Sequence, residues 1–149
     1  MKNCAVILAG GEGKRMKSDK PKTLSEVLGR PMLCWVMSAL RKAGIDDICV
    51  VKGFKKECVE EYLSTLDFSV ESVFQAERLG TGHAVMMAKD FLKKHSGNVV
   101  ILNGDAPFID ADTLRASLEL HTSSNSEVTV ITADIDDPQG YGRIIRSSG

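Results

Sequence analysis

The sequence lacks the features that mark membrane and secreted proteins. No stretch is apolar over the roughly 18 residues that a membrane-spanning helix needs. The N-terminus shows no signal-peptide pattern and leads directly into a strand-like run. The four cysteines form no CxxC pair, and the three histidines do not have the spacing of metal ligands. We therefore expect a cytoplasmic protein with reduced thiols and no membrane span.

The sequence also has no excess of positive or negative charge. The chain has 19 Lys and Arg against 20 Asp and Glu, so the net charge is −1 and no overall field attracts nucleic acid or a membrane surface. Internal repeats and low-complexity tracts are absent. The 149 residues, 43% of them apolar, indicate one globular domain rather than a disordered chain.

Short apolar runs alternate with amphipathic stretches along the chain, which predicts an α/β fold with a largely parallel sheet. The strands are expected at residues 4–9, 45–51, 68–74, 98–102 and 128–135, with a last one starting at 144–145. The helices are expected from Pro31 to Gly44, at 56–66 and 83–94, and from Asp110 or Asp112 to His121.

A glycine-rich loop follows the first strand at Gly10, Gly11 and Gly13, and a basic segment comes after it. Glycines let a backbone approach a ligand closely and align several N–H groups, which favours phosphate binding. The segment is not a dinucleotide fingerprint, because the third glycine of GxGxxG is missing, and it is not a GxxxxGK[ST] loop. The basic side chains that would offset phosphate charge are Lys14, Arg15, Lys17, Lys20 and Lys22. The alternative interpretation is a tight turn beside a solvated basic face.

Asp105 follows the apolar run 98–102 and Gly104. A carboxylate at the end of a buried strand is suited to hold a divalent metal that bridges phosphate oxygens, although an aspartate in a turn is the alternative. Ligands of open α/β sheets bind beyond the carboxyl ends of the strands. The glycine loop, Gln75 and Asp105 are therefore expected to converge. His83 is interpreted as a residue at a helix N-terminus rather than as a general base.

Four motifs together resemble the sugar-nucleotide nucleotidyltransferases. The segment 8–16 (LAGGEGKRM), followed by Pro21 and Lys22, is similar to the signature loop of that superfamily. The segments 75–84 (QAERLGTGHA), 103–107 (NGDAP) and 137–144 (DPQGYGRI) are similar to those of bacterial N-acetylglucosamine-1-phosphate uridyltransferases. The resemblance implies a Rossmann-like, three-layer α/β/α nucleotidyltransferase fold with a mostly parallel mixed sheet. It also implies that residues 1–149 are a C-terminally truncated, N-terminal portion of that domain.

The resemblance also implies roles for individual residues. The uridine would be held by the backbone of Leu8, Ala9, Gly10 and Gly11 and by Gly80 and Thr81, while Gln75 reads the uracil edge. Arg15 and Lys22 would be catalytic, stabilising the triphosphate and the charge that develops at the α-phosphorus. Asn103, Gly104 and Asp105 would bind substrate, as would Lys22; Asp105 would also ligate Mg2+, and Gly142 would contact the sugar.

The reaction implied is attack of N-acetylglucosamine 1-phosphate on the α-phosphate of UTP, with release of pyrophosphate. Mg2+ is the expected cofactor, nucleic acid and membranes are not expected partners, and the full-length family members are expected to be homo-oligomers. Two alternatives stay open: a nucleotidyltransferase of cytidylyl or guanylyl type, and a non-catalytic nucleotide-binding module. Base preference separates the first from the uridyltransferase, and dependence of binding on metal separates the second.

Overall fold

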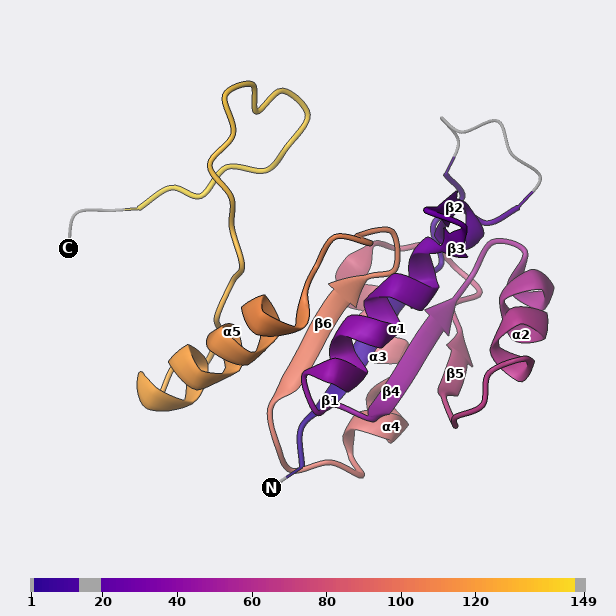
Figure 1. Ribbon diagram of the computed structural model, residues 1–149, viewed down its shortest axis with the longest axis horizontal. Helices are drawn as coiled ribbons and strands as arrows, with labels where there is room; N and C mark the ends of the chain where they lie inside the picture. Colours follow the sequence, from indigo (N-terminus) through magenta and orange to yellow (C-terminus); the bar gives the residue numbers. More distant parts are fainter. Residues whose placement is uncertain (1, 14–19, 147–149) are drawn as a thin grey trace.

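A four-stranded parallel sheet forms the centre of the computed structural model, which describes residues 2–13 and 20–146 (Figure 1). The strand order is β5-β4-β1-β6. The strands are β1 (Cys4–Ala9), β4 (Asp47–Lys52), β5 (Glu71–Phe74) and β6 (Val99–Asn103). The chain adds β4 and β5 on one side of β1 and then crosses over to add β6 on the other. Open α/β sheets form a ligand crevice where the strand order reverses in this way, and here that place lies beside β1.

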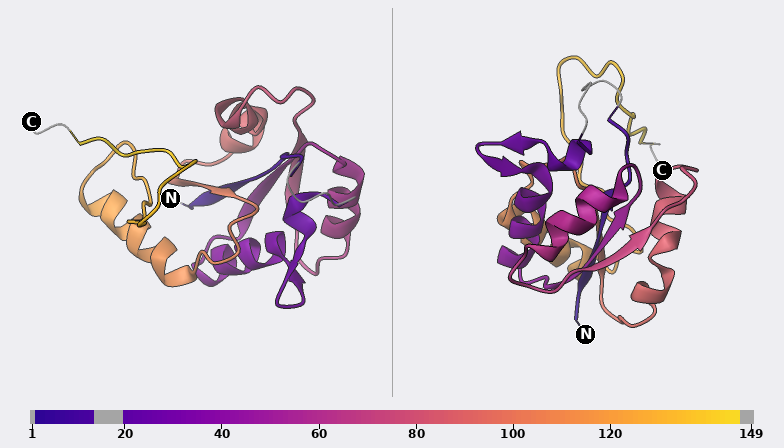
Figure 2. Two further views of the ribbon diagram at one scale, coloured as in Figure 1. Left: turned by 90° about the horizontal axis from the view of Figure 1, so that it is seen from above. Right: turned by 90° about the vertical axis from the view of Figure 1, so that its right-hand side faces the viewer.

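Helices cover both faces of the sheet (Figure 2). The helices α1 (Met32–Lys42), α2 (Lys56–Ser64) and α5 (Ala111–Ser123) share one apolar cluster with the sheet. On the opposite face, α3 (Thr81–Met87) and α4 (Lys89–Leu92) share a second cluster. Because both faces are covered, β1 is apolar throughout, and its residues Cys4 to Ile7 have no exposed surface. The three-layer α/β/α prediction is confirmed.

Local sequence signals explain both ends of α1. Pro31 has φ −52° and ψ 141° directly before the first helical residue, and its fixed φ angle suits a helix entry. At the other end Gly44 has φ 84°, the left-handed conformation that glycine adopts without strain. The Ile45 N–H donates to the Leu40 carbonyl at 3.0 Å and the Gly44 N–H to the Arg41 carbonyl at 2.9 Å. These two hydrogen bonds form a Schellman motif, which directs the chain back into β4.

Several predicted elements differ from the observed ones. The stretch 83–94 forms two helices, α3 and α4, which meet at Ala88 with ψ 10°, and the strand expected at 68–74 is confined to β5. Residues 22–31 contain a 3-10 turn, η2 (Lys22–Leu24), and a hairpin of β2 (Glu26–Val27) and β3 (Arg30–Pro31), none of which was predicted.

The prediction of strands at 128–135 and from Ile144 is wrong. Residues 127–146 form neither strand nor helix, and Val128 and Val130 are 77% and 64% exposed. An alternating apolar pattern specifies a strand only where a partner strand and an apolar surface are available to it. Nothing in the described part of the chain pairs with this segment.

The cysteines are free thiols, as predicted. Cys4 and Cys49 are fully buried on neighbouring strands, while Cys34 and Cys58 are half-buried. Burial raises the pKa of the Cys49 thiol to about 11, and the nearby Glu71 carboxylate adds to this effect. The thiol therefore stays protonated and unreactive at neutral pH. Within the described residues, no helix is long and apolar enough to cross a membrane.

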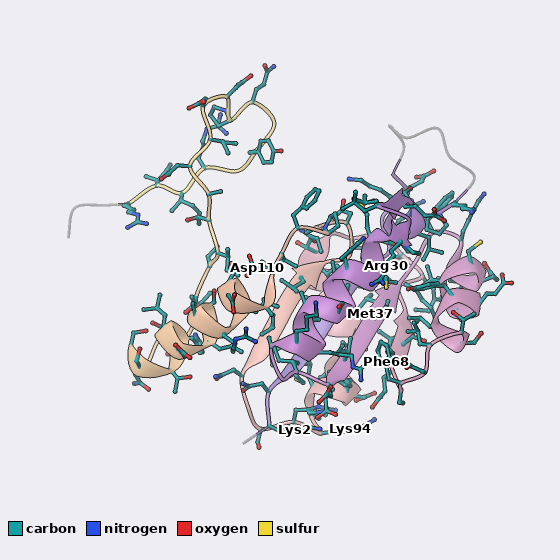
Figure 3. All side chains as sticks on the ribbon, viewed as in Figure 1. Lys2, Arg30, Met37, Phe68, Lys94 and Asp110 are labelled. Atoms are coloured by element: carbon teal, nitrogen blue, oxygen red, sulfur yellow. The ribbon has the colours of Figure 1, made fainter. Side chains whose placement is uncertain are left out.

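Several ion pairs lie at the amino ends of the strands. Lys2 and Lys94 mark this end of the sheet, and Arg30 lies toward the other end (Figure 3). The Lys2 ammonium is 2.9 Å from the Asp47 carboxylate, and His95 Nε2 is 3.4 Å from the same group. The hydrogen bond from Lys2 lowers the pKa of Asp47. Ion pairs thus link the chain segments at the amino ends of the strands. The predicted site residues lie at the opposite end of the sheet.

Loss of the Asp110 carboxylate is expected to weaken α5. Asp110 accepts a hydrogen bond from the Thr113 N–H at 2.8 Å and caps the helix, and this bond lowers the pKa of the carboxyl. A lowered pKa stabilises the fold above the unfolded-state pKa, and this contribution disappears as the pH falls through the folded-state pKa. Thermal unfolding should therefore show the melting temperature of Asp110→Ala about 2–4 °C below wild type at neutral pH, with the gap narrowing in acid.

Two variants control this prediction. Asp110→Asn keeps an acceptor at the cap and should melt near the wild type at neutral pH. Asp112→Asn removes a neighbouring carboxylate that pairs with Arg115 at the surface and should change the melting temperature little. Equal effects of Asp110→Ala and Asp112→Asn would contradict the capping role.

Candidate functional site

A cleft of about 860 Å3 opens at the carboxyl ends of β1, β5 and β6. Most of the residues predicted to bind substrate line it: Leu8, Gly10, Gly11, Lys22, Gln75, Gly80, Thr81, Asn103 and Asp105. They come from four separate stretches of the chain. The predicted convergence of the glycine loop, Gln75 and Asp105 on one place is confirmed.

The glycine loop is held against the end of β4 by a very close backbone contact. A Cβ atom on Gly53 would lie 2.7 Å from both the Cα and the carbonyl oxygen of Gly10, so only glycine fits there. The Phe54 N–H donates to the Gly10 carbonyl at 3.2 Å across the same contact. This contact positions the loop, whose residues Gly10, Gly11 and Gly13 line the cleft.

Lys22 and Asp105 face each other across the cleft. The Lys22 ammonium is 2.7 Å from Asp105 Oδ2, and both side chains are about one-third exposed, at 35% and 34%. The structure thus places a cation and a carboxylate from segments 83 residues apart at the same point. Each can exchange its partner for a ligand atom: the ammonium for phosphate oxygens, and the carboxylate for a cation.

Asp105 shares the cleft with side chains that carry neutral oxygens. Asn103 and Thr23 line the same cleft, and Thr23 Oγ1 is the one buried side-chain polar atom without a hydrogen-bond partner among the described residues. No group of three or more His, Cys, Asp or Glu gathers within residues 2–13 and 20–146. A single carboxylate that shares a cleft with neutral oxygens fits a hard divalent cation, which can keep bound waters and take further ligands from substrate phosphates.

An ion pair at the edge of the cleft joins two of the loops that line it. Arg78, in the loop between β5 and α3, lies 2.7 Å from the carboxylate of Glu12 in the glycine loop. Both side chains are partly exposed, so the pair contributes little to stability. Its effect is on geometry, because it holds together two loops that are 66 residues apart in sequence.

Some predicted residues lie elsewhere. Ala9 is fully buried in the sheet, and Gly104 is buried behind the cleft wall, where its N–H donates to the Leu8 carbonyl at 2.9 Å. Gly142 is exposed in the loop 127–146 and does not line the cleft, although the adjacent Tyr141 does. Arg15 lies outside the described residues.

Sequence reasoning missed several cleft residues: Thr23, Arg78, Ala84 and Tyr141. Arg78 and Tyr141 lie inside two of the recognised motifs, so the sequence placed them near the site. It did not show that their side chains line the cleft. Thr23 directly follows Lys22 and is buried by the turn η2, which the sequence did not predict.

Comparison with known proteins decides the family. A family model described as nucleotidyl transferase matches residues 4–149, nearly the whole chain. The chain belongs to the nucleotidyl transferase family. A solved UDP-glucose pyrophosphorylase from Acinetobacter baumanii resembles this nucleotidyl transferase chain with a TM-score of 0.69 and 25% identity, over 85% of this chain and 54% of that one.

Relatives with higher identity carry the name bifunctional protein GlmU. The one from Clostridium tetani is 47% identical over 148 residues, which is 99% of this chain and 32% of the relative. The one from Caldanaerobacter subterraneus subsp. tengcongensis is 50% identical over 142 residues, 95% of this chain and 30% of the relative. This nucleotidyl transferase chain therefore spans about a third of the length of the relatives that it matches.

Proposed function

We propose that the cleft binds UTP and N-acetylglucosamine 1-phosphate and that the protein forms UDP-N-acetylglucosamine and pyrophosphate in the cytoplasm. The observation that carries the proposal is the placement of Lys22, Asp105 and Gln75 around one cleft at the carboxyl ends of the strands. The identity to proteins named GlmU, close to one half over nearly all of this chain, supports it. We further propose that residues 1–149 form the N-terminal portion of the nucleotidyltransferase domain.

Each group in the cleft would have a defined task. The backbone of Gly10 and Gly11 would approach the nucleoside, and Gln75 would present an acceptor to the uracil edge. Lys22 would offset the charge of the triphosphate. Arg15, predicted to act with it, remains part of the proposal on sequence grounds.

The proposed reaction does not require a general base to activate the nucleophile. The attacking oxygen of a sugar phosphate is already an anion, so the protein needs to position it in line with the leaving pyrophosphate and to stabilise the charge that develops. Among the described residues, the Lys22 ammonium is suited to that electrostatic role because it stands 2.7 Å from the carboxylate that would hold the metal. Asp105 would hold Mg2+, which would supply further positive charge to the phosphate oxygens when bound.

Calorimetric titration with UTP, CTP, GTP and ATP, each with and without Mg2+, tests the proposal. UTP is expected to bind most tightly, and only with Mg2+ present should Asp105→Asn weaken its affinity, by about tenfold or more. Asp112→Asn removes an exposed carboxylate of α5 and serves as the matched control. Equal affinity for all four nucleotides would contradict the uridine site. Binding that ignores Mg2+ would favour the non-catalytic nucleotide-binding module.

A further inference from the structure

Gln75 has an unusual environment for a residue in a ligand cleft. The residue is only 5% exposed, and its backbone N–H donates to the Lys52 carbonyl at 2.9 Å, which fixes it at the end of β5. Its side-chain nitrogen, Nε2, has two partners. Nε2 is 3.2 Å from the Gly80 carbonyl oxygen and 3.0 Å from His83 Nδ1.

These two contacts together determine which groups donate. A backbone carbonyl only accepts hydrogen bonds, so the amide nitrogen, and not the amide oxygen, must face Gly80. The same nitrogen then donates its second hydrogen to His83. His83 Nδ1 must therefore be an unprotonated acceptor, and the imidazole is neutral with its proton on Nε2.

The amide oxygen of Gln75 is left for a ligand. Oε1 has no hydrogen-bond donor among the described residues, and it lies 3.0 Å from the position that a Cβ atom on Gly10 would occupy. Gly10 and Gln75 both line the cleft. The side chain thus keeps an acceptor beside Gly10, a residue of the cleft lining, while both of its donor hydrogens are used inside the protein.

We propose that His83 is a positioning residue for base selection: it fixes the Gln75 amide so that Oε1 faces the nucleobase. The proposal rests on the uridine site proposed above and adds to it the device that sets its selectivity. The pairing edge of uracil presents acceptor, donor and acceptor in order, whereas that of cytosine presents acceptor, acceptor and donor. An acceptor fixed opposite the central position accepts from uracil N3–H and repels the lone pair of cytosine N3.

Without His83, only the longer contact to Gly80 would oppose rotation of the amide. A rotated Gln75 would present Nε2 to the base, and a donor in that position satisfies cytosine N3 instead. Loss of His83 should therefore change the ratio of affinities for UTP and CTP more than it changes the affinity of the cleft for the phosphates.

The test measures the affinities for UTP, CTP and inorganic pyrophosphate by calorimetry with Mg2+, for the wild type and three variants. His83→Leu removes the acceptor and should lower the preference for UTP over CTP by about tenfold, the factor that corresponds to one hydrogen bond. His83→Asn offers an acceptor oxygen in place of Nδ1 and should keep the preference within about threefold of wild type. His121→Leu, on α5, is the matched control and should change nothing in the cleft. Affinity for pyrophosphate should stay constant in all of them.

Each outcome has one meaning. A wild type that prefers UTP together with a His83→Leu variant that keeps this preference overturns the role of His83 and leaves the uridine site standing. A wild type that does not discriminate overturns both proposals. Independently of binding, nitrogen NMR of the imidazoles, assigned with the His83→Asn variant, should show His83 as the neutral tautomer protonated at Nε2. A proton on Nδ1 in the free protein would also overturn the proposal.

Discussion

Replacement of Lys22 by methionine is expected to lower the rate of the proposed nucleotidyl transfer by about 10²–10³, the usual effect of removing one preorganised charge from the transition state. Methionine keeps much of the apolar stem but removes the ammonium that lies 2.7 Å from Asp105. Affinity for UTP should fall as well, because the triphosphate loses a cation in a partly enclosed cleft. Turnover of UTP and N-acetylglucosamine 1-phosphate, with UTP affinity measured in parallel, checks this prediction.

The control for Lys22 is a double-mutant cycle with Asp105. Since the two side chains contact each other, the effects of Lys22→Met and Asp105→Asn on UTP affinity should not add. Lys20→Met removes a neighbouring exposed cation and should have a much smaller effect. Additive losses in the cycle, or an equal loss in Lys20→Met, would show that Lys22 acts only through the general charge of the segment.

Replacement of Gly53 by alanine is expected to disrupt both the fold and the cleft. The new Cβ atom would lie 2.7 Å from the Gly10 backbone on the facing loop, and backbone cannot move aside as a flexible side chain can. The loop must shift outward or β4 must bend, which should destabilise the protein by about 1–3 kcal/mol, as overpacking does. Denaturant unfolding measures the stability, and UTP titration should show reduced affinity even where the variant is folded.

Gly82→Ala is the matched control for stability. Gly82 lies in α3, and a Cβ atom there would meet nothing within 4 Å. Alanine in a helix with free space should be neutral or stabilise the protein by up to about 1 kcal/mol. If Gly53→Ala were as stable as Gly82→Ala, the close approach between the two loops would not be needed for the fold.

The sequence predicted best those features that local patterns determine. The apolar run at 4–9 matches β1 to the residue, and Gly44 ends α1 because a left-handed turn at that position has a direct signature. The position of the cleft followed from a general property of parallel sheets: the carboxyl ends of their strands share one edge. The sequence left the cap of α5 open between Asp110 and Asp112, and the structure shows that it is Asp110.

Other features depend on contacts between distant segments, and the sequence did not reveal them. The strand expected at 128–135 has an alternating pattern but no partner within the described residues, so pattern alone was misleading. His83 was interpreted as an ordinary residue at a helix start, because only the fold brings its imidazole to within 3.0 Å of Gln75. The ion pair between Glu12 and Arg78 likewise depends on two loops that meet only in the folded chain.

The position of β1 in the sheet has a consequence for folding during synthesis. The strand β1 pairs on one side with residues 47–52 and on the other with residues 99–103, so it leaves the ribosome before both of its partners. At about 5–20 residues per second, the second partner emerges roughly 5–20 seconds after the first strand. Through that interval one edge of an entirely apolar strand stays unpaired, which is a hazard for aggregation. Residues 4–9 are thus an apolar segment that chaperones could bind in the nascent chain during that interval.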